Sequence, residues 1–68
     1  ISLDNVGNLI VIKTLSASAN AAAEAIDSMK WSEVLGSIAG DNTILVIARS
    51  EEAVESLMAR FNTLIKRS

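Results

Sequence analysis

The sequence predicts a small α+β domain in two layers, with the element order ββαββα and a four-stranded, largely antiparallel sheet that carries two helices on one face. Two turn-rich stretches are each flanked by short, β-rich apolar segments, which is the pattern of two hairpins. Each hairpin is followed by a segment with apolar residues at helical spacing. The 68 residues contain no proline. We find no low-complexity segment and no domain boundary, and we therefore expect one domain over residues 1–68.

The first hairpin is expected at the N-terminal end of the chain. Ile1–Asp4 alternates apolar and polar residues, and Asn5–Asn8 supplies turn residues before the β-rich run Leu9–Leu15. The apolar side chains of this run fall on both faces of the strand, with Leu9, Val11 and Leu15 on one and Ile10 and Ile12 on the other. The strand is therefore predicted to be buried on both sides.

A first helix is expected after Ser16–Ser18, whose hydroxyls can cap its first turn. The face predicted to pack on the sheet consists of Ala19, Ala22, Ala23, Ile26 and Met29. A neighbouring stripe, polar except at its last member, consists of Asn20, Glu24, Asp27 and Trp31. The following stretch, Trp31–Leu35, shows no sustained period and is interpreted as a connector.

The second hairpin is expected to turn within Gly36–Thr43. Gly40 can take the positive φ that tight hairpin turns require, while Asp41 and Asn42 tolerate left-handed backbone. The strand that leaves the turn, Thr43–Arg49, again has apolar residues on both faces. The hairpin therefore carries a carboxylate at its tip.

The second helix is the most regular pattern in the chain. Ser50 can cap it, and Glu51–Glu52 would meet the positive end of its macrodipole. Its apolar stripe consists of Ala53, Val54, Leu57, Met58, Phe61, Leu64 and Ile65. Lys66–Arg67 would lie at the negative end of the same helix.

Size and composition predict self-association. A domain this short buries only roughly 60% of the surface of its unfolded chain, and small domains usually add disulfides, a metal or oligomerisation. The chain has no cysteine and no histidine, and 50% of its residues are hydrophobic. With both helices on one face, apolar side chains on the other face of the sheet need a cover. Identical subunits are the simplest one.

Several function classes are disfavoured by composition. The net charge is −2 with only six scattered basic residues, which argues against a chain that grips nucleic acid by itself. No apolar run approaches the ~20 residues of a membrane span and no signal peptide is recognisable, so we expect a cytoplasmic protein without a membrane partner. Without His, Cys or Tyr, and without a nucleophile beside a base, we expect no enzyme, metal or cofactor.

The sequence begins with Ile1 and not with an initiating Met. We therefore expect a fragment of a longer protein.

Asp27 and Asp41 are the acidic candidates for ligand binding. Spacing alone favours a plainer interpretation, in which Asp27 is solvated and Asp41 serves the turn. Asn20 is equally open between a ligand and a local bond in the first helical turn. Trp31, the only tryptophan, is expected to anchor a core or an interface rather than to stack on a ligand.

Three stretches carry a resemblance to a known family: Asp4–Thr14, Ala19–Asn20 with the helix that bears Asp27, and Leu35–Ile44. On these stretches the chain resembles, nearly end to end, the C-terminal domain of bacterial arginine repressors. The last is the most specific, because the family pattern there is close to G-[TS]-I-[AC]-G-D-D-T and this chain matches it except at Asn42. Ser16–Ala17 also departs from the Pro-Gly that the family commonly has.

The resemblance implies a ββαββα domain that forms trimers, and hexamers by stacking of trimers, with L-arginine bound as a corepressor between trimers. It also implies a winged helix-turn-helix domain upstream of residues 1–68, through which alone the protein would bind DNA. The leading hypothesis is therefore an effector-binding and oligomerisation domain of an arginine-dependent repressor of arginine metabolism.

The resemblance also assigns ligand-binding roles by position. Asp41 would take the guanidinium of an arginine held mainly by the opposite trimer, because a carboxylate can bind that planar fork with two parallel bonds. Asn20, Asp27 and the backbone of Ala39 would hold the α-carboxylate and α-amino groups. If the family's second Asp contributes charge, Asn42 at this position should weaken arginine binding or narrow its pH range.

Two alternatives stay open at this point. One is a structural oligomerisation module without a ligand, which the two-sided strands and the departures at Ser16–Ala17 and Asn42 support. The other is an amino-acid sensor of the ACT type, whose usual element order begins βαβ, so that the strand order in a structure discriminates it.

Overall fold

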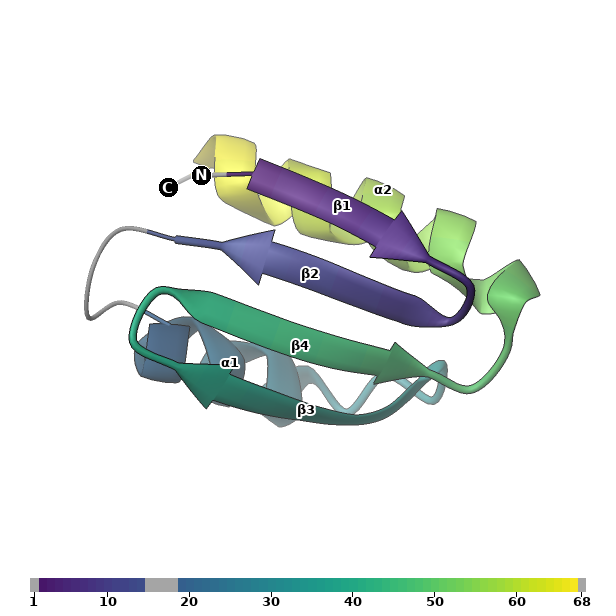
Figure 1. Cartoon of the computed structure of the whole chain (residues 1–68), viewed down its shortest axis with the longest axis horizontal. Helices are drawn as coiled ribbons and strands as arrows, with labels where there is room; N and C mark the ends of the chain where they lie inside the picture. The colour runs from purple at the N-terminus through teal and green to yellow at the C-terminus, as the bar shows by residue number, and fades with distance from the viewer. Residues whose placement is uncertain (1, 15–18, 68) are drawn as a thin grey trace.

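The computed structural model describes residues 2–14 and 19–67, with side-chain surroundings up to residue 63. Its elements are β1 (Ser2–Val6), β2 (Leu9–Lys13), α1 (Ala19–Met29), β3 (Val34–Gly40), β4 (Thr43–Ala48) and α2 (Glu51–Arg67). The four strands form one sheet in the order β1-β2-β4-β3, with every neighbouring pair antiparallel. Both helices lie on the same side of this sheet (Figure 1). The predicted α+β fold is confirmed, and an element order that begins ββα removes the ACT-type alternative.

The hydrophobic core lies between the sheet and the two helices. The register pairs Ile10 with Val46 and Ile12 with Ile44, so these side chains share one face of the sheet. The buried core residues are Ile10, Ile12, Ala19, Ala23, Ile26, Ile44, Val46, Ala48, Val54, Leu57 and Phe61. They include every described residue predicted for the apolar face of either helix except Ala22, Ala53 and Met58, which are only half-buried, and Met29, which is exposed. The side chains of Leu64 and Ile65 lie outside the described residues.

Neither helix covers the opposite face of the sheet (Figure 1). The centre of this opposite face is nevertheless apolar. The register aligns the apolar side chains of this face across all four strands. We call it the open sheet face and define it by Val6, Leu9, Val11, Ile38, Leu45 and Ile47. Val6 is 70% exposed and Ile38 is 67% exposed. The predicted burial of β2 on both sides is therefore confirmed on one face only, since the described part of the single chain leaves the other face uncovered, and Leu15 lies outside the described residues.

Each hairpin turns on two residues, and in each the first one has a positive φ. Gly7 has φ 56° in the β1–β2 turn and Asp41 has φ 24° in the β3–β4 turn, a feature of type II′ turns. The prediction that Gly40 supplies the positive φ is wrong. Gly40 pairs with Thr43 as the last residue of β3, so the first turn position falls on Asp41.

Three further details differ from the prediction. Asn5–Val6 lies in β1 rather than in the turn, because both residues pair with β2. β3 begins at Val34 rather than after Leu35, and an irregularity between Val34 and Gly36 interrupts the alternation that signals a strand. Met29 is 39% exposed, because it lies at the margin of the apolar stripe, in the last turn of α1.

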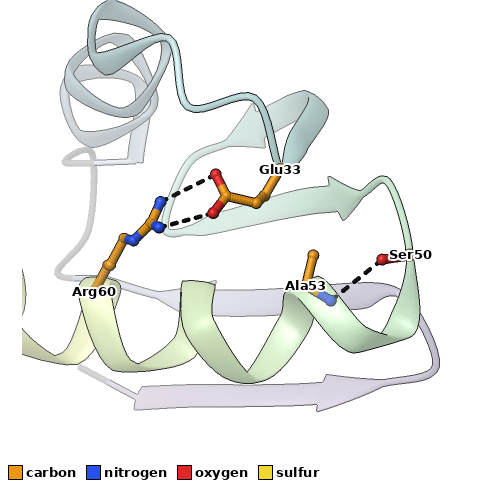
Figure 2. Close-up of polar contacts among 4 residues, drawn as sticks. All are labelled: Glu33, Ser50, Ala53 and Arg60. Atoms are coloured by element: carbon orange, nitrogen blue, oxygen red, sulfur yellow. Dashed lines mark hydrogen bonds and ion pairs between the residues drawn. The ribbon is translucent and has the colours of Figure 1, made fainter.

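α2 begins as predicted, with the backbone N–H of Ala53 donating to Ser50 Oγ at 3.3 Å (Figure 2). Glu51 and Glu52 lie in its first turn. The cap expected at Ser16–Ser18 lies outside the described residues, as do the side chains expected to act at 64–67. Within the described ranges, no helix combines the length and the apolar character needed to cross a membrane.

Lys30 directly follows α1 with a left-handed backbone, φ 51°, and its N–H donates to the carbonyl of Asp27 at 3.2 Å. That conformation costs a residue with a Cβ about 1–2 kcal/mol, and glycine is the usual residue there. We therefore expect Lys30→Gly to raise the free energy of unfolding by about 0.5–1 kcal/mol. The matched control Lys30→Ala retains a Cβ and should give no gain. Urea unfolding measures both, and equal midpoints for the two variants would contradict the explanation.

Candidate functional site

Four of the five predicted site residues, all but Asp27, belong to the start of α1 or to the β3–β4 hairpin at and beside its turn. The start of α1 and this turn lie at the same end of the domain (Figure 1). The backbone N–H of Ala19, the first residue of α1, donates to the carbonyl of Asp41 at 3.2 Å. The backbone N–H of Thr14 donates to the carbonyl of Asn42 at 2.7 Å. Two residues from elsewhere in the chain therefore hold the two turn residues in place, and we call Asp41–Asn42 with these bonds the anchored turn.

The anchored turn presents its side chains at the surface. Asp41 and Asn42 are both exposed. Thr43 Oγ1 donates to Asn42 Oδ1 at 3.0 Å, so the amide of Asn42 is engaged within the hairpin. Asn20 is exposed in the first turn of α1, and it follows the residue that donates to Asp41. The structure thus brings Asn20, Asp41 and Asn42 to one end of the domain.

Asp27 lies two turns further along α1 and faces β3. Ser37 Oγ donates to Asp27 Oδ1 at 3.2 Å, which links the helix to the strand. Sequence reasoning did not name Ser37 as a site residue. The signal was present, because the family pattern requires a hydroxyl residue at that position. Asp27 is exposed despite this bond.

The backbone of Ala39 lies at an edge of the sheet. Among the described strands, β3 has β4 on one side and no neighbour on the other. In a hairpin with a two-residue turn, the closing pair Gly40–Thr43 exchanges backbone hydrogen bonds, and the next pair Ala39–Ile44 does not. The N–H and C=O of Ala39 therefore point away from β4, and they can bind a polar group that approaches the edge.

The chemistry of these groups suits a zwitterion with a cationic side chain. The carboxylates of Asp27 and Asp41 accept hydrogen bonds from ammonium and guanidinium groups. The amide NH₂ of Asn20 and the backbone N–H of Ala39 can donate to a carboxylate. Residues 20 and 27 are about 10 Å apart along the helix, which leaves room for both ends of an amino acid. In the part of the chain that the structure describes, no group of three or more Asp or Glu side chains is placed to hold a metal ion.

A second surface feature lies elsewhere on the domain. A shallow groove of about 430 Å³ runs between the β1–β2 turn and the start of α2. It is lined by Asn5, Gly7, Glu51, Val54, Glu55 and Met58. None of the predicted site residues borders this groove.

Comparison with known proteins finds one matching domain family and several similar proteins. Residues 1–63 match the model of the arginine repressor C-terminal domain. The chain is 54% identical over 66 residues to an arginine repressor of Thermoanaerobacter sp. (strain X514). It is 48% and 52% identical over 66 residues to arginine repressors of Ruminiclostridium cellulolyticum and Alkaliphilus oremlandii. Each match covers 97% of this chain and 44% of the relative, so the chain spans less than half the length of these proteins.

Proposed function

Because this chain belongs to the arginine repressor C-terminal domain family, we propose that it is the arginine-sensing and self-associating part of an arginine-dependent repressor of arginine metabolism. The family is one of transcription regulators, and this confirms the prediction that the chain is not an enzyme. In this proposal L-arginine is the corepressor. A winged helix-turn-helix domain that precedes residues 1–68 binds DNA, and the protein works in the cytoplasm.

The anchored turn is the observation that carries the proposal. Hydrogen bonds from Thr14 and Ala19 hold the backbone of Asp41–Asn42, so little ordering is needed when a ligand arrives. The Asp41 carboxylate then takes a guanidinium with two parallel, charge-assisted bonds. Because Asp41 projects from a hairpin tip, it reaches an arginine that another subunit holds by its other end.

That other end is bound along α1 and β3. The Asp27 carboxylate binds the α-ammonium group, and the hydrogen bond from Ser37 orients this carboxylate. Asn20 and the backbone of Ala39 take the α-carboxylate. Asn20 and Asp27 are exposed and Ala39 belongs to a strand at the edge of the sheet, so a second chain completes the enclosure of the ligand.

The open sheet face supports the self-association. Its uncovered aliphatic side chains extend across all four strands, and burying a few hundred Å² of such surface contributes on the order of several kcal/mol. We propose that this face joins subunits into trimers, and that arginine bound between trimers favours hexamers by mass action. The open sheet face alone would equally serve a structural module without a ligand, so ligand binding is the decisive test.

Calorimetry with L-arginine and with L-citrulline makes that test. Citrulline has the same length and α-groups, but a neutral urea replaces the charged guanidinium. We expect uptake of L-arginine and at least about tenfold weaker uptake of citrulline, because a neutral group loses the charge-assisted bonds to Asp41. Equal uptake of both would remove Asp41 from its role, and uptake of neither would favour the structural module.

A further inference from the structure

Arg60 of α2 binds residues 30–33, the connector that joins α1 to β3. Its Nη1 donates to Glu33 Oε1 at 3.1 Å and its Nη2 donates to Glu33 Oε2 at 2.7 Å (Figure 2). Its guanidinium carbon lies 5.1 Å from the centre of the Trp31 ring. The Trp31 ring lies in turn 5.5 Å from the ring of Phe61, a core residue. Arg60 and Glu33 thus form a bidentate ion pair, and the Arg60 guanidinium packs against an aromatic ring that itself contacts the core.

The rest of the connector is held by Arg49, which directly follows β4, and by its own turn. Arg49 donates twice, from its backbone N–H to the Glu33 carbonyl at 2.9 Å and from Nε to the Ser32 carbonyl at 2.7 Å. The backbone N–H of Val34 donates to the Trp31 carbonyl at 3.1 Å. The short path from α1 to β3 is therefore fixed by side chains and backbone from outside both elements.

In the sequence, the connector lies between Asp27 and Ser37, which form a hydrogen bond in the candidate site. Asp27 lies four residues before Trp31, and Ser37 lies four residues after Glu33. The 3.2 Å bond between Asp27 and Ser37 joins exposed groups and is weak by itself. At the N-terminal end of α1, the backbone bond from Ala19 to Asp41 ties the helix to the β3–β4 turn. At the other end of α1, the connector restrains the helix relative to β3.

We propose that Arg60 is a positioning residue for the arginine site, and that it acts through Glu33 and Trp31 to hold α1 and β3 where Asp27 and Ala39 can bind one ligand. The inference rests on the proposed function. Arg60 itself touches no ligand, since it binds the far end of the connector. Lysine cannot replace it fully, because an ammonium group lacks the planar fork that engages both oxygens of Glu33.

The Arg60 hydrogen bonds also lower the pKa of Glu33 below its usual value. The pair is therefore ionised at neutral pH, and its contribution is lost only as the pH falls through that lowered pKa. Binding measurements near neutral pH thus test the intact ion pair.

Calorimetry with L-arginine on matched variants tests the positioning role. Arg60→Gln removes the charged fork but keeps a long polar side chain. The control Ser50→Ala removes the cap of the same helix without touching the connector. We expect Arg60→Gln to weaken L-arginine binding about tenfold, because small misplacements of binding groups are costly. Ser50→Ala should leave the affinity within about twofold despite a lower thermal midpoint, and Arg60→Lys should fall between.

Two further readouts separate positioning from a general loss of stability. Glu33→Gln should match Arg60→Gln, and the double variant should lose no more than either single variant, because the two residues act as one pair. The emission of Trp31, the only tryptophan, should change in Arg60→Gln and not in Ser50→Ala.

Three outcomes would overturn the inference: equal affinity losses in Arg60→Gln and Ser50→Ala, an unchanged affinity in Arg60→Gln, or fully additive losses in the double variant. A failure of the proposed function gives a different result, since the unaltered protein would then take up no L-arginine, and the inference would fall with it.

Discussion

The Asp41→Asn protein is expected to bind L-arginine about 30- to 100-fold more weakly than the unaltered protein while keeping its fold. The substitution replaces a charged acceptor pair by a neutral amide, and losing such charge-assisted bonds costs about 2–3 kcal/mol. The turn itself should survive. Asparagine tolerates positive φ as well as aspartate does, and the anchoring bonds to this turn use backbone carbonyls.

Glu55→Gln is the matched control for this prediction. It removes one exposed carboxylate from α2, so that the net charge changes by the same amount away from the turn. Calorimetry of both variants separates a local contact from a general electrostatic effect. If Asp41→Asn lost no more affinity than Glu55→Gln, the turn would not be a ligand contact.

Leu45→Asp is expected to dissociate the assembly into single chains. Leu45 lies in the middle of the open sheet face, where the register pairs it with Val11 on one side and Ile38 on the other. A carboxylate there would be buried without a partner when subunits join, which costs several kcal/mol. In the separate chain it would face water, so the fold itself should tolerate it.

The control Ser56→Asp introduces the same charge at an exposed position of α2. Sedimentation velocity should report a species near 7.2 kDa for Leu45→Asp and the unaltered assembly for Ser56→Asp. An unchanged assembly in Leu45→Asp would place the subunit contacts on another surface.

The fold could be predicted because its signals are local. Ile10 and Ile12 alternate with Leu9 and Val11 in β2, and this period predicts a strand with two apolar faces. The start of β3 was missed because an irregularity beside Leu35 breaks the same period. The positive φ was assigned to the wrong residue because strand register fixes the turn, and register depends on pairing between distant residues.

The candidate site could be predicted only in part. Spacing alone left Asp27 and Asp41 as ordinary surface carboxylates, and only the family resemblance gave them a ligand. The contacts that organise the site join residues far apart in sequence, 10 positions for Ser37 with Asp27 and 27 positions for Arg60 with Glu33. Such pairs leave no periodic pattern in the sequence, so the structure was needed to find them.

The central claim is that L-arginine links subunits at the anchored turn. Sedimentation velocity with and without saturating L-arginine tests it most directly, at a protein concentration where trimers and hexamers are both populated. We predict that L-arginine shifts the distribution to hexamers, and that citrulline does not. The same distribution in all three conditions would contradict the claim and leave a self-associating domain whose assembly is independent of arginine.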